Sequence, residues 1–432
     1  MVAPFRLHFL FGGIGQALAH RMYRDYWLGN TVTQTGRWMW RTAIGWLTWE
    51  LTHSTSWLGL IAFAEAAPLV ALTLFAGALA DRVGYFRILR VTQFASSCVA
   101  VALAALVLMG FITVELVFLL VLVNGAFEAV SYPSRMAAVH ALVPRRDLSP
   151  AIALGSITFN GARIVGPAIA GPLIVVVGVG GVLAITSAAF FLFYVVLRTI
   201  RVEEPSHEGT VARKVFSDVG DGIRYMFRDR GILYLMFLAG ATGLLIRPYI
   251  ELLPAYSAQV FARGPDGLAI LLASIGIGAM CSGVWVAQRG RISGLTNIVA
   301  LGAIGMAGAA LFFTAADSIW IAAILLALSG GSMLANNVGS QTLIQNAVDA
   351  RMRGRMLSLF VVISWGLPAL GAVVMGWLAS IIGIRLAVAG GSALALVLGI
   401  WAWRIAPRLA RSLEGGPPAV FEPRRDRSPG AP

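Results

Sequence analysis

The sequence predicts an all-α membrane protein with twelve transmembrane helices in two six-helix bundles and with both termini in the cytoplasm. Three observations predict this fold: the composition, the length of the apolar segments, and the distribution of Lys and Arg. The chain of 432 residues is 58% hydrophobic and only 12% charged, which is about half the charge of an average soluble domain. A lipid bilayer, rather than water, is therefore the expected surrounding of most of the chain.

The apolar segments have the length that a bilayer requires, because a hydrocarbon core roughly 30 Å thick needs about 20 apolar residues per helix. The apolar residues of each segment follow one another without alternating polar residues, which predicts helices and excludes the strands of a membrane barrel. The sixth, ninth and twelfth segments are short. The expected spans are 27–51, 57–79, 90–110, 114–137, 152–176, 182–197, 231–255, 268–287, 298–314, 319–342, 356–381 and 386–403.

Lys and Arg alternate between the two sides of the predicted membrane. They are abundant in the N-terminal segment, in every second gap between predicted helices, and in the tail, whereas the other gaps contain only Arg263 and Arg385. By the positive-inside rule the basic side is cytoplasmic. The formal net charge of +13 is therefore a topology signal, and no nucleic-acid partner is expected.

The longest polar interval divides the chain into two halves. Within it, four apolar residues recur at four-residue steps among basic residues, namely Val215, Val219, Ile223 and Phe227. This pattern predicts an amphipathic helix on the inner leaflet, and a solvated linker with no lipid role is the alternative. The expected domains are an N-terminal extension (1–23), an N-terminal six-helix bundle (24–198), a cytoplasmic linker with the amphipathic helix (199–230), a C-terminal six-helix bundle (231–404) and a disordered cytoplasmic tail (405–432).

The N-terminal extension contains an apolar stretch too short to span a bilayer. A start codon assigned too far upstream is one interpretation of it.

Enzymatic chemistry has no support in the sequence. Cys98 and Cys281 fall in predicted helices without the paired spacing of a metal or redox motif, and the five His residues do not cluster. No phosphate-binding loop is present. We therefore expect no enzyme, no cofactor and no metal, and a transport process driven by an ion gradient or by another subunit.

A charged turn follows the second predicted span. Its key residues are Gly77, Asp81, Arg82, Gly84 and Arg87. Their spacing resembles G-x-x-x-D-R-x-G-[RK]-[RK], the loop between helices 2 and 3 of the major facilitator superfamily. The family's basic pair is replaced here by Tyr85 and Phe86.

The resemblance implies a twelve-helix fold whose substrate site lies between the two bundles near the middle of the membrane. It also implies a gating role for Asp81, which would pair with Arg or cap a neighbouring helix in one state. The alternative is a turn that only helps to set the membrane topology, in which Asp81 has no functional role. A second copy of the loop, at 288–291, has kept basic residues and has no Asp.

The fifth predicted helix carries Arg163, Gly166, Pro167 and Gly171, a pattern that resembles the helix-5 motif of antiporters and exporters in this superfamily. Small residues allow a partner helix to approach closely, and Pro removes a backbone hydrogen bond and kinks the helix. Packing without functional meaning is the alternative.

Segments across roughly residues 24–405 resemble the enterobactin-exporter-like branch of drug and siderophore exporters. Three of them carry the likeness: 24–30, 142–148 and 353–358. The resemblance implies efflux of small molecules across a bacterial inner membrane by a multi-pass protein, expected to act as a monomer.

Charged residues inside a bilayer cost several kcal/mol and must face a cavity or a partner. Charged residues in predicted helices 1, 4 and 7 and side-chain amides in predicted helix 10 stand out, and these four helices line the central cavity in the superfamily. Arg37 and Arg41 share one helix face, which requires an anion or a carboxylate nearby. We expect the substrate cavity to contain Arg37, Arg41, Trp40, Arg247, Asn337 and Gln341.

Three buried acids are candidates for proton coupling: Glu251 and Glu128 first, and Glu65 third. Burial favours the protonated form of a carboxyl group and a neighbouring Arg favours the charged form. A carboxylate whose partner moves away can therefore bind and release a proton. Arg247 can pair with Glu251 along their helix, and Arg163 is a possible partner of Glu128 or Glu65.

The sequence as a whole predicts a secondary active transporter that exports small amphipathic compounds in exchange for protons. Its expected partners are a small-molecule substrate, protons and the lipid bilayer. An importer or facilitator of a small metabolite is the first alternative. A non-transporting membrane receptor or assembly factor on the same fold is the second, and its sign would be loss of the charged cavity.

Overall fold

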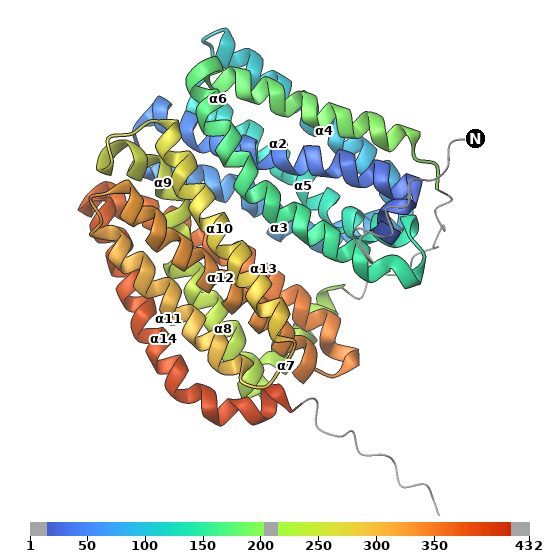
Figure 1. The fold of residues 1–432 in the computed structure, drawn as a ribbon, viewed down its shortest axis with the longest axis vertical. Helices are drawn as coiled ribbons and strands as arrows, with labels where there is room; N and C mark the ends of the chain where they lie inside the picture. The colour runs from blue at the N-terminus through green and yellow to red at the C-terminus, as the bar shows by residue number, and fades with distance from the viewer. Residues whose placement is uncertain (1–14, 203–214, 416–432) are drawn as a thin grey trace, which may run out of the picture.

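The computed structural model describes residues 15–202 and 215–415. Within these ranges the side chains of 73–75, 77–78, 81, 215–219 and 351 are not described. Every secondary-structure element of the described part is helical. Figure 1 shows two groups of long helices, one from each half of the chain.

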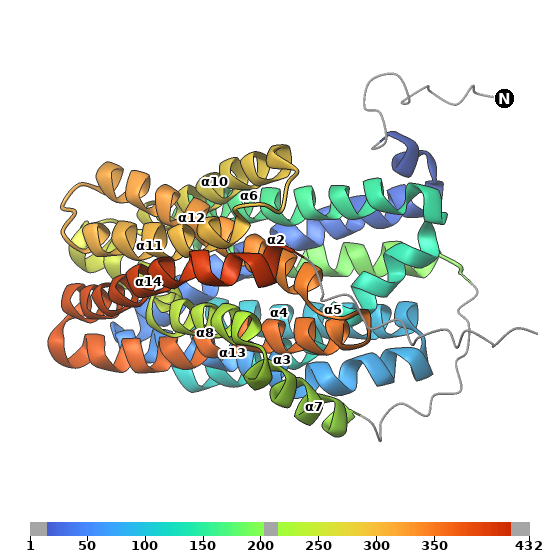
Figure 2. The ribbon, with the colours of Figure 1, turned by 90° about the horizontal axis from the view of Figure 1, so that it is seen from below.

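The first group consists of α2 (Arg21–Thr52), α3 (Thr55–Val83), α4 (Tyr85–Leu108), α5 (Val114–Leu142), the short turn η1 (Arg145–Asp147) and α6 (Leu148–Thr199). The second consists of α8 (Arg230–Leu245), η2 (Arg247–Leu252), α9 (Leu253–Ala255), η3 (Tyr256–Val260), α10 (Pro265–Arg289), α11 (Leu295–Thr314), α12 (Ile319–Ala347), α13 (Ala350–Ile382) and α14 (Ile384–Glu414). Between them in the sequence lies α7 (Val215–Arg228), which occupies the range of the predicted amphipathic helix. Figure 2 shows it at the outer edge of the molecule.

Ten segments of the described chain are long and apolar enough to cross a membrane. Side chains on the outside of the helices are also apolar: Leu108, Phe312 and Ile324 are each about two-thirds exposed or more. Such a surface is unusual for a soluble protein and fits contact with lipid. The all-helical membrane fold is confirmed, whereas the count of twelve spans remains a prediction.

The longest helix, α6, is broken at Gly178. This glycine has φ +73° and ψ 171°, which is not helical. Without the break, 52 residues would extend for about 78 Å, more than twice the thickness of a bilayer core. Figure 1 shows the green ribbon of α6 reversing direction at the top of the molecule. The break falls between the fifth and sixth predicted spans.

The expected loop at 77–87 is much shorter in the structure. Helix α3 continues through Asp81 and Arg82 to Val83, and α4 begins at Tyr85. Only Gly84, with φ +92°, lies between the two helices. A residue without a Cβ adopts this angle freely, so one glycine makes the turn and the charged residues remain helical.

The predicted span 231–255 is interrupted. Helix α8 ends at Leu245, and the chain continues through three short helical turns of different pitch to Val260. Pro248 and Pro254 explain this, because each lacks the N–H that a helix needs and its ring disturbs the preceding turn. The irregular backbone places Arg247 and Glu251 in the interior.

The last helix extends ten residues beyond the expected boundary at 404 and ends at Glu414. Leu413 is buried there. The Glu414 carboxylate accepts hydrogen bonds from the backbone N–H groups of Gly294 (2.6 Å) and Thr296 (2.9 Å) at the start of α11. These contacts hold the end of α14 in place. The remainder of the predicted tail, 416–432, lies outside the described residues.

The two groups meet through α3 against α13 and through α6 against α10. Hydrogen bonds join α3 to α13: Thr55 Oγ1 donates to the Gly376 carbonyl (2.8 Å), and the Ser56 and Ser380 hydroxyls are 3.1 Å apart. A methyl group at Gly59 would lie 2.1 Å from the Ala372 carbonyl oxygen. The helices therefore approach to backbone contact, which small residues permit.

Candidate substrate and proton-coupling site

Two arginines of α2 form ion pairs with acids from other elements. Arg37 pairs with Glu128 of α5, and Arg41 pairs with Glu251 of η2. The first pair lies within one group of helices, and the second joins the two groups. Arg37 and Arg41 need carboxylates nearby, and Glu128 and Glu251, which are far away in the sequence, supply them.

Glu128 has a second partner, Arg135, whose Nη2 lies 2.7 Å from the same carboxylate oxygen. Arg135 is only 6% exposed, and it was not among the residues expected in the cavity. Helix α5 continues to Leu142, so Arg135 lies well inside it. Its position two turns after Glu128 on the same face is the signal that could have identified it. In the described part of the chain, Arg163 forms an ion pair with neither Glu128 nor Glu65.

Arg247 does not pair with Glu251, contrary to the expectation from their spacing. Its Nη1 donates instead to the Ser364 carbonyl of α13 (2.6 Å). Both residues lie in η2, a 3-10 segment of three residues per turn, so side chains four apart no longer share a face as they would in an α-helix. The expected pair is therefore wrong.

A small cavity in the second group is lined by Arg247 together with Asn337 of α12. Two residues expected in the substrate cavity thus share one opening. Asn336 donates to the Val299 carbonyl (2.8 Å). Gln341 is exposed and does not line this cavity. The other lining residues are Ala239, Thr242, Met306, Met333, Asn336, Phe360 and Ser364.

Glu65 of α3 lies near these ion pairs and belongs to none of them. The strongest electrostatic influences on it come from Arg41, Glu251 and Arg37, yet no cation of the described chain is within 4 Å of its carboxylate. A methyl group at Gly125 of α5 would be 2.6 Å from the Glu65 carbonyl oxygen. Close contact between α3 and α5 therefore fixes the position of this acid.

Trp38 lies beside two arginines of the interior. The guanidinium carbons of Arg41 and Arg163 are each 5.7 Å from the centre of its ring. This distance is within the range of a cation–π interaction. The neighbouring Trp40 is only 1% exposed and packs in the apolar core, so it contributes to packing and not to the lining.

The helix-5 motif makes two different close contacts. A methyl group at Gly166 would be 2.4 Å from Trp38 Cβ on α2, and one at Gly171 would be 2.4 Å from Ala269 Cβ on α10. Pro167 lies inside α6 between them, and Arg163 is one turn earlier. The small residues thus bring α6 against a helix of its own group and a helix of the other group.

The gating-loop candidates are described only in part. Arg82 and Arg87 are exposed, and Gly84 makes the turn. The side chains at Gly77 and Asp81 lie outside the described residues. The gating role of Asp81 therefore stays a prediction.

The chain matches known proteins along nearly all of its length. A family model described as "Transmembrane secretion effector" matches residues 16–421. The chain belongs to this family. Its members are major facilitator transporters of the efflux type, as the sequence resemblance predicted. The family is one of transporters and not of enzymes, and the chain is a multi-pass protein of the bacterial inner membrane.

Three transporters are among the known proteins that resemble this chain in sequence. The staphyloferrin A transporter of Staphylococcus aureus is 24% identical over 81% of this chain and 87% of its own. The multidrug efflux pump Tap of Mycolicibacterium fortuitum is 24% identical over 83% and 89%, respectively. The enterobactin exporter EntS of Shigella flexneri is 24% identical over 76% and 78%.

Solved structures with the same fold include a peptide transporter POT in complex with sulfate, with a TM-score of 0.73 and 14% identity over 93% of this chain and 99% of that one. A bacterial homologue of the lysosomal transporter Spinster, in an inward-facing conformation, has a TM-score of 0.68 and 15% identity over 91% and 98%. At these identities the likeness concerns the fold alone.

Proposed function

We propose that this family member exports small amphipathic compounds, drug-like or siderophore-like, in exchange for protons and by alternating access. The Arg41–Glu251 ion pair between the two groups of helices is the observation that carries the proposal. The efflux-type relatives support the direction of transport.

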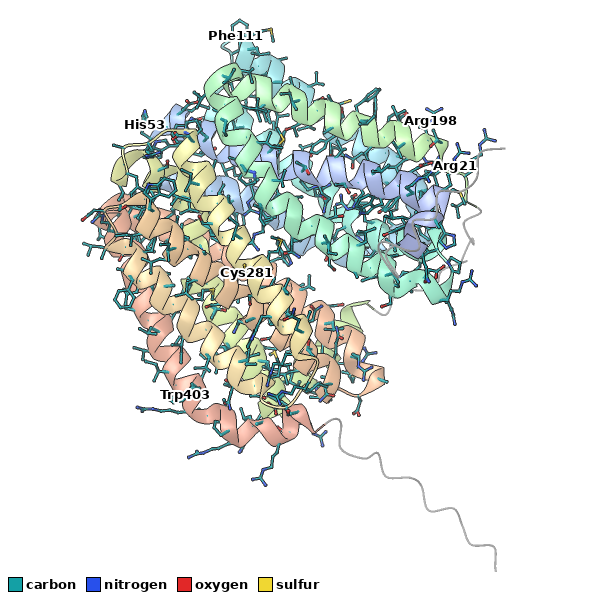
Figure 3. The ribbon with its side chains drawn as sticks, viewed as in Figure 1. Arg21, His53, Phe111, Arg198, Cys281 and Trp403 are labelled. Carbon is teal, nitrogen blue, oxygen red and sulfur yellow. The ribbon has the colours of Figure 1, made fainter. Side chains whose placement is uncertain are left out.

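Twelve spans with cytoplasmic termini belong to the same proposal. The ten apolar segments do not include α2, whose arginines lower its hydropathy, and they count the broken α6 once. Adding α2 and dividing α6 at Gly178 gives twelve. In Figure 3, Arg21 and Arg198 lie at one end of the first group, and His53 and Phe111 lie at the other. The positive-inside rule assigns the Arg21 end to the cytoplasm.

The three acids differ in how a rocking motion would affect them. Glu128 is held by Arg37 and Arg135 of its own group, so a rigid rotation of the groups leaves both ion pairs intact. The Glu251 pair joins the groups and breaks when they separate. A carboxylate that loses its arginine in one state takes up a proton there and releases it on re-pairing. Glu251 is therefore the proposed proton carrier.

Glu65 is the proposed intermediate site for the proton. It lies close enough to Arg41 and Glu251 to interact with both electrostatically and has no ion pair to break in the described chain. A proton released from Glu251 can therefore be accepted there.

Inside-out membrane vesicles containing the protein test the proposal. Two amphipathic probes are used, the cation ethidium and the carboxylate naphthoate. With an acid interior, we expect uptake of at least one of them that stops when nigericin removes the pH gradient. Glu251→Gln should abolish the gradient-dependent part, because the amide cannot carry a proton. The control is Glu115→Gln, which changes an exposed acid of α5 and should behave as the parent protein.

Uptake that persists at the same rate without the gradient would contradict proton coupling. A D-xylose–proton symporter shares the fold at 15% identity and a TM-score of 0.67, so the fold alone is compatible with import. Right-side-out vesicles with an acid exterior distinguish the two directions. Gradient-dependent accumulation of the probe there would favour the importer.

A further inference from the structure

Positive charge exceeds negative charge in the interior of the protein. Arg37 and Arg135 share Glu128, and Arg41 holds Glu251. Two arginines, Arg163 of α6 and Arg247 of η2, remain. Within the described chain neither has a carboxylate at ion-pair distance.

The contacts that these two arginines do make leave their charge uncompensated. Arg247 donates to the Ser364 carbonyl, and Arg163 lies over the ring of Trp38. Arg41 repels both arginines electrostatically, and Arg247 repels Arg163. Glu251 attracts Arg247, but this carboxylate is already paired with Arg41. Unpaired like charges within a membrane protein are costly, and a bound anion would remove this cost.

Glu65 does not supply the missing charge. Its strongest electrostatic partners are Arg41, Glu251 and Arg37, which already belong to the ion pairs. The surplus therefore stays with Arg163 and Arg247, one on each of the two groups of helices.

The surroundings of the two arginines suit an organic anion better than an inorganic one. Trp38 offers an aromatic face beside Arg163. The cavity that contains Arg247 also has an amide donor, Asn337, and an apolar wall made by Met306, Met333 and Phe360. In this structure the cavity has room for about one water molecule, so an amphipathic ligand would enter it only when the two groups of helices move apart.

We propose that Arg163 and Arg247 form an anion subsite between the two groups of helices, with Trp38 and Asn337 as its further contacts, and that the transported compounds are amphipathic carboxylates. The inference rests on the proposed export function and specifies its substrate class. A carboxylate contacting both arginines would also connect the groups, so that its binding favours their approach around the ligand.

Three probes that differ only in charge test the subsite: naphthoate, the neutral naphthamide, and the cationic naphthylmethylammonium. Binding to the purified full-length protein is measured by quenching of Trp fluorescence. We expect naphthoate to bind at least about tenfold more tightly than naphthamide, because arginine donates stronger hydrogen bonds to a charged carboxylate than to a neutral amide, and we expect the cation not to bind. Equal affinities for naphthoate and naphthamide would overturn the proposal.

Substitutions test whether Arg163 and Arg247 form the subsite. Arg163→Gln and Arg247→Gln should each lower the affinity for naphthoate about tenfold and leave that for naphthamide unchanged. The Lys variants should retain most of the affinity because they keep the charge. The control is Arg404→Gln, at an exposed position of α14, which should bind as the parent does.

Thermal unfolding without ligand separates a binding role from a structural one. Removing an uncompensated cation relieves repulsion, so Arg163→Gln should melt no lower than the parent. A sharply lower melting temperature together with lost binding would assign Arg163 a structural role and overturn the proposal. Naphthoate binding that chloride displaces fully, but gluconate does not, would point to an inorganic anion site and overturn it as well.

These measurements need no pH gradient, so they are independent of the transport assay. Naphthoate binding without gradient-driven transport would contradict the exporter and leave the subsite intact. Gradient-driven transport of ethidium with no preference for naphthoate would contradict the subsite alone.

Discussion

The acidic residues of the interior differ in the number and position of their arginine partners. Glu128 lies between two arginines of its own group of helices, whereas Glu251 has one partner from the other group. Removing one member of a buried ion pair leaves an uncompensated charge, which costs about 3–5 kcal/mol. The structural contribution of Glu128 should therefore exceed that of Glu251.

We expect Glu128→Leu to lower the stability of the protein by about 3 kcal/mol, because Arg37 and Arg135 both lose their partner. Glu251→Leu should cost less, since Arg41 keeps its contact with Trp38. Thermal unfolding in detergent compares the two variants. A larger loss for Glu251→Leu would contradict this ranking.

The sequence could place these charges in the membrane but could not pair them. Four-residue spacing correctly indicated a shared face for Arg37 and Arg41. Arg41 and Glu251 are separated by 210 positions in the chain, and only the packing of two groups of helices brings them together. The predicted pair of Arg247 and Glu251 was wrong because the chain after α8 is a 3-10 segment, in which residues four apart do not share a face.

At the scale of single elements, close glycine contacts determine how the helices pack. The sequence pattern in α6 indicated close approach, and the structure identifies the neighbours as α2 and α10. The extent of the helices was less predictable. The turn between α3 and α4 needs only Gly84. Helix α14 continues to Glu414, whose carboxylate contacts the backbone at the start of α11, a region distant in the sequence.

Gly166→Ala should separate α6 from α2, because its methyl group would lie 2.4 Å from Trp38 Cβ. Overpacking of this kind costs about 1–3 kcal/mol, and the shift of Trp38 should also weaken naphthoate binding. Thermal unfolding and the fluorescence titration measure both effects.

The matched control is Gly155→Ala in the same helix, where a methyl group would meet no atom within 4 Å. It should be neutral or slightly stabilising. If Gly155→Ala and Gly166→Ala had the same effect, the close contact would not be the cause.

For the whole molecule, the contacts between α3 and α13 near Thr55 and Ser56 must separate if that end is to open. The proposed alternating access requires the two ends of the molecule to open in turn. A covalent bond at this position would therefore stop the cycle without disturbing the fold.

We expect Ser56→Cys combined with Ser380→Cys to form a disulfide on mild oxidation, since the two hydroxyl oxygens are 3.1 Å apart. The test uses a background in which Cys98 and Cys281 are replaced by Ala. Vesicle transport should stop on oxidation and return on reduction, while each single variant stays active. Full transport by the cross-linked protein would exclude opening at this end.

The Glu414 contact bears on the internal symmetry of the molecule. The second copy of the motif loop, near Arg289, has lost its acid in the sequence. In space an acid is present, because the end of α14 brings the Glu414 carboxylate to the N–H groups of Gly294 and Thr296, within electrostatic reach of Arg289. The end of α14 thus supplies this loop with an acid that the loop lacks in its own sequence, and a comparison of the two loop sequences alone does not reveal it.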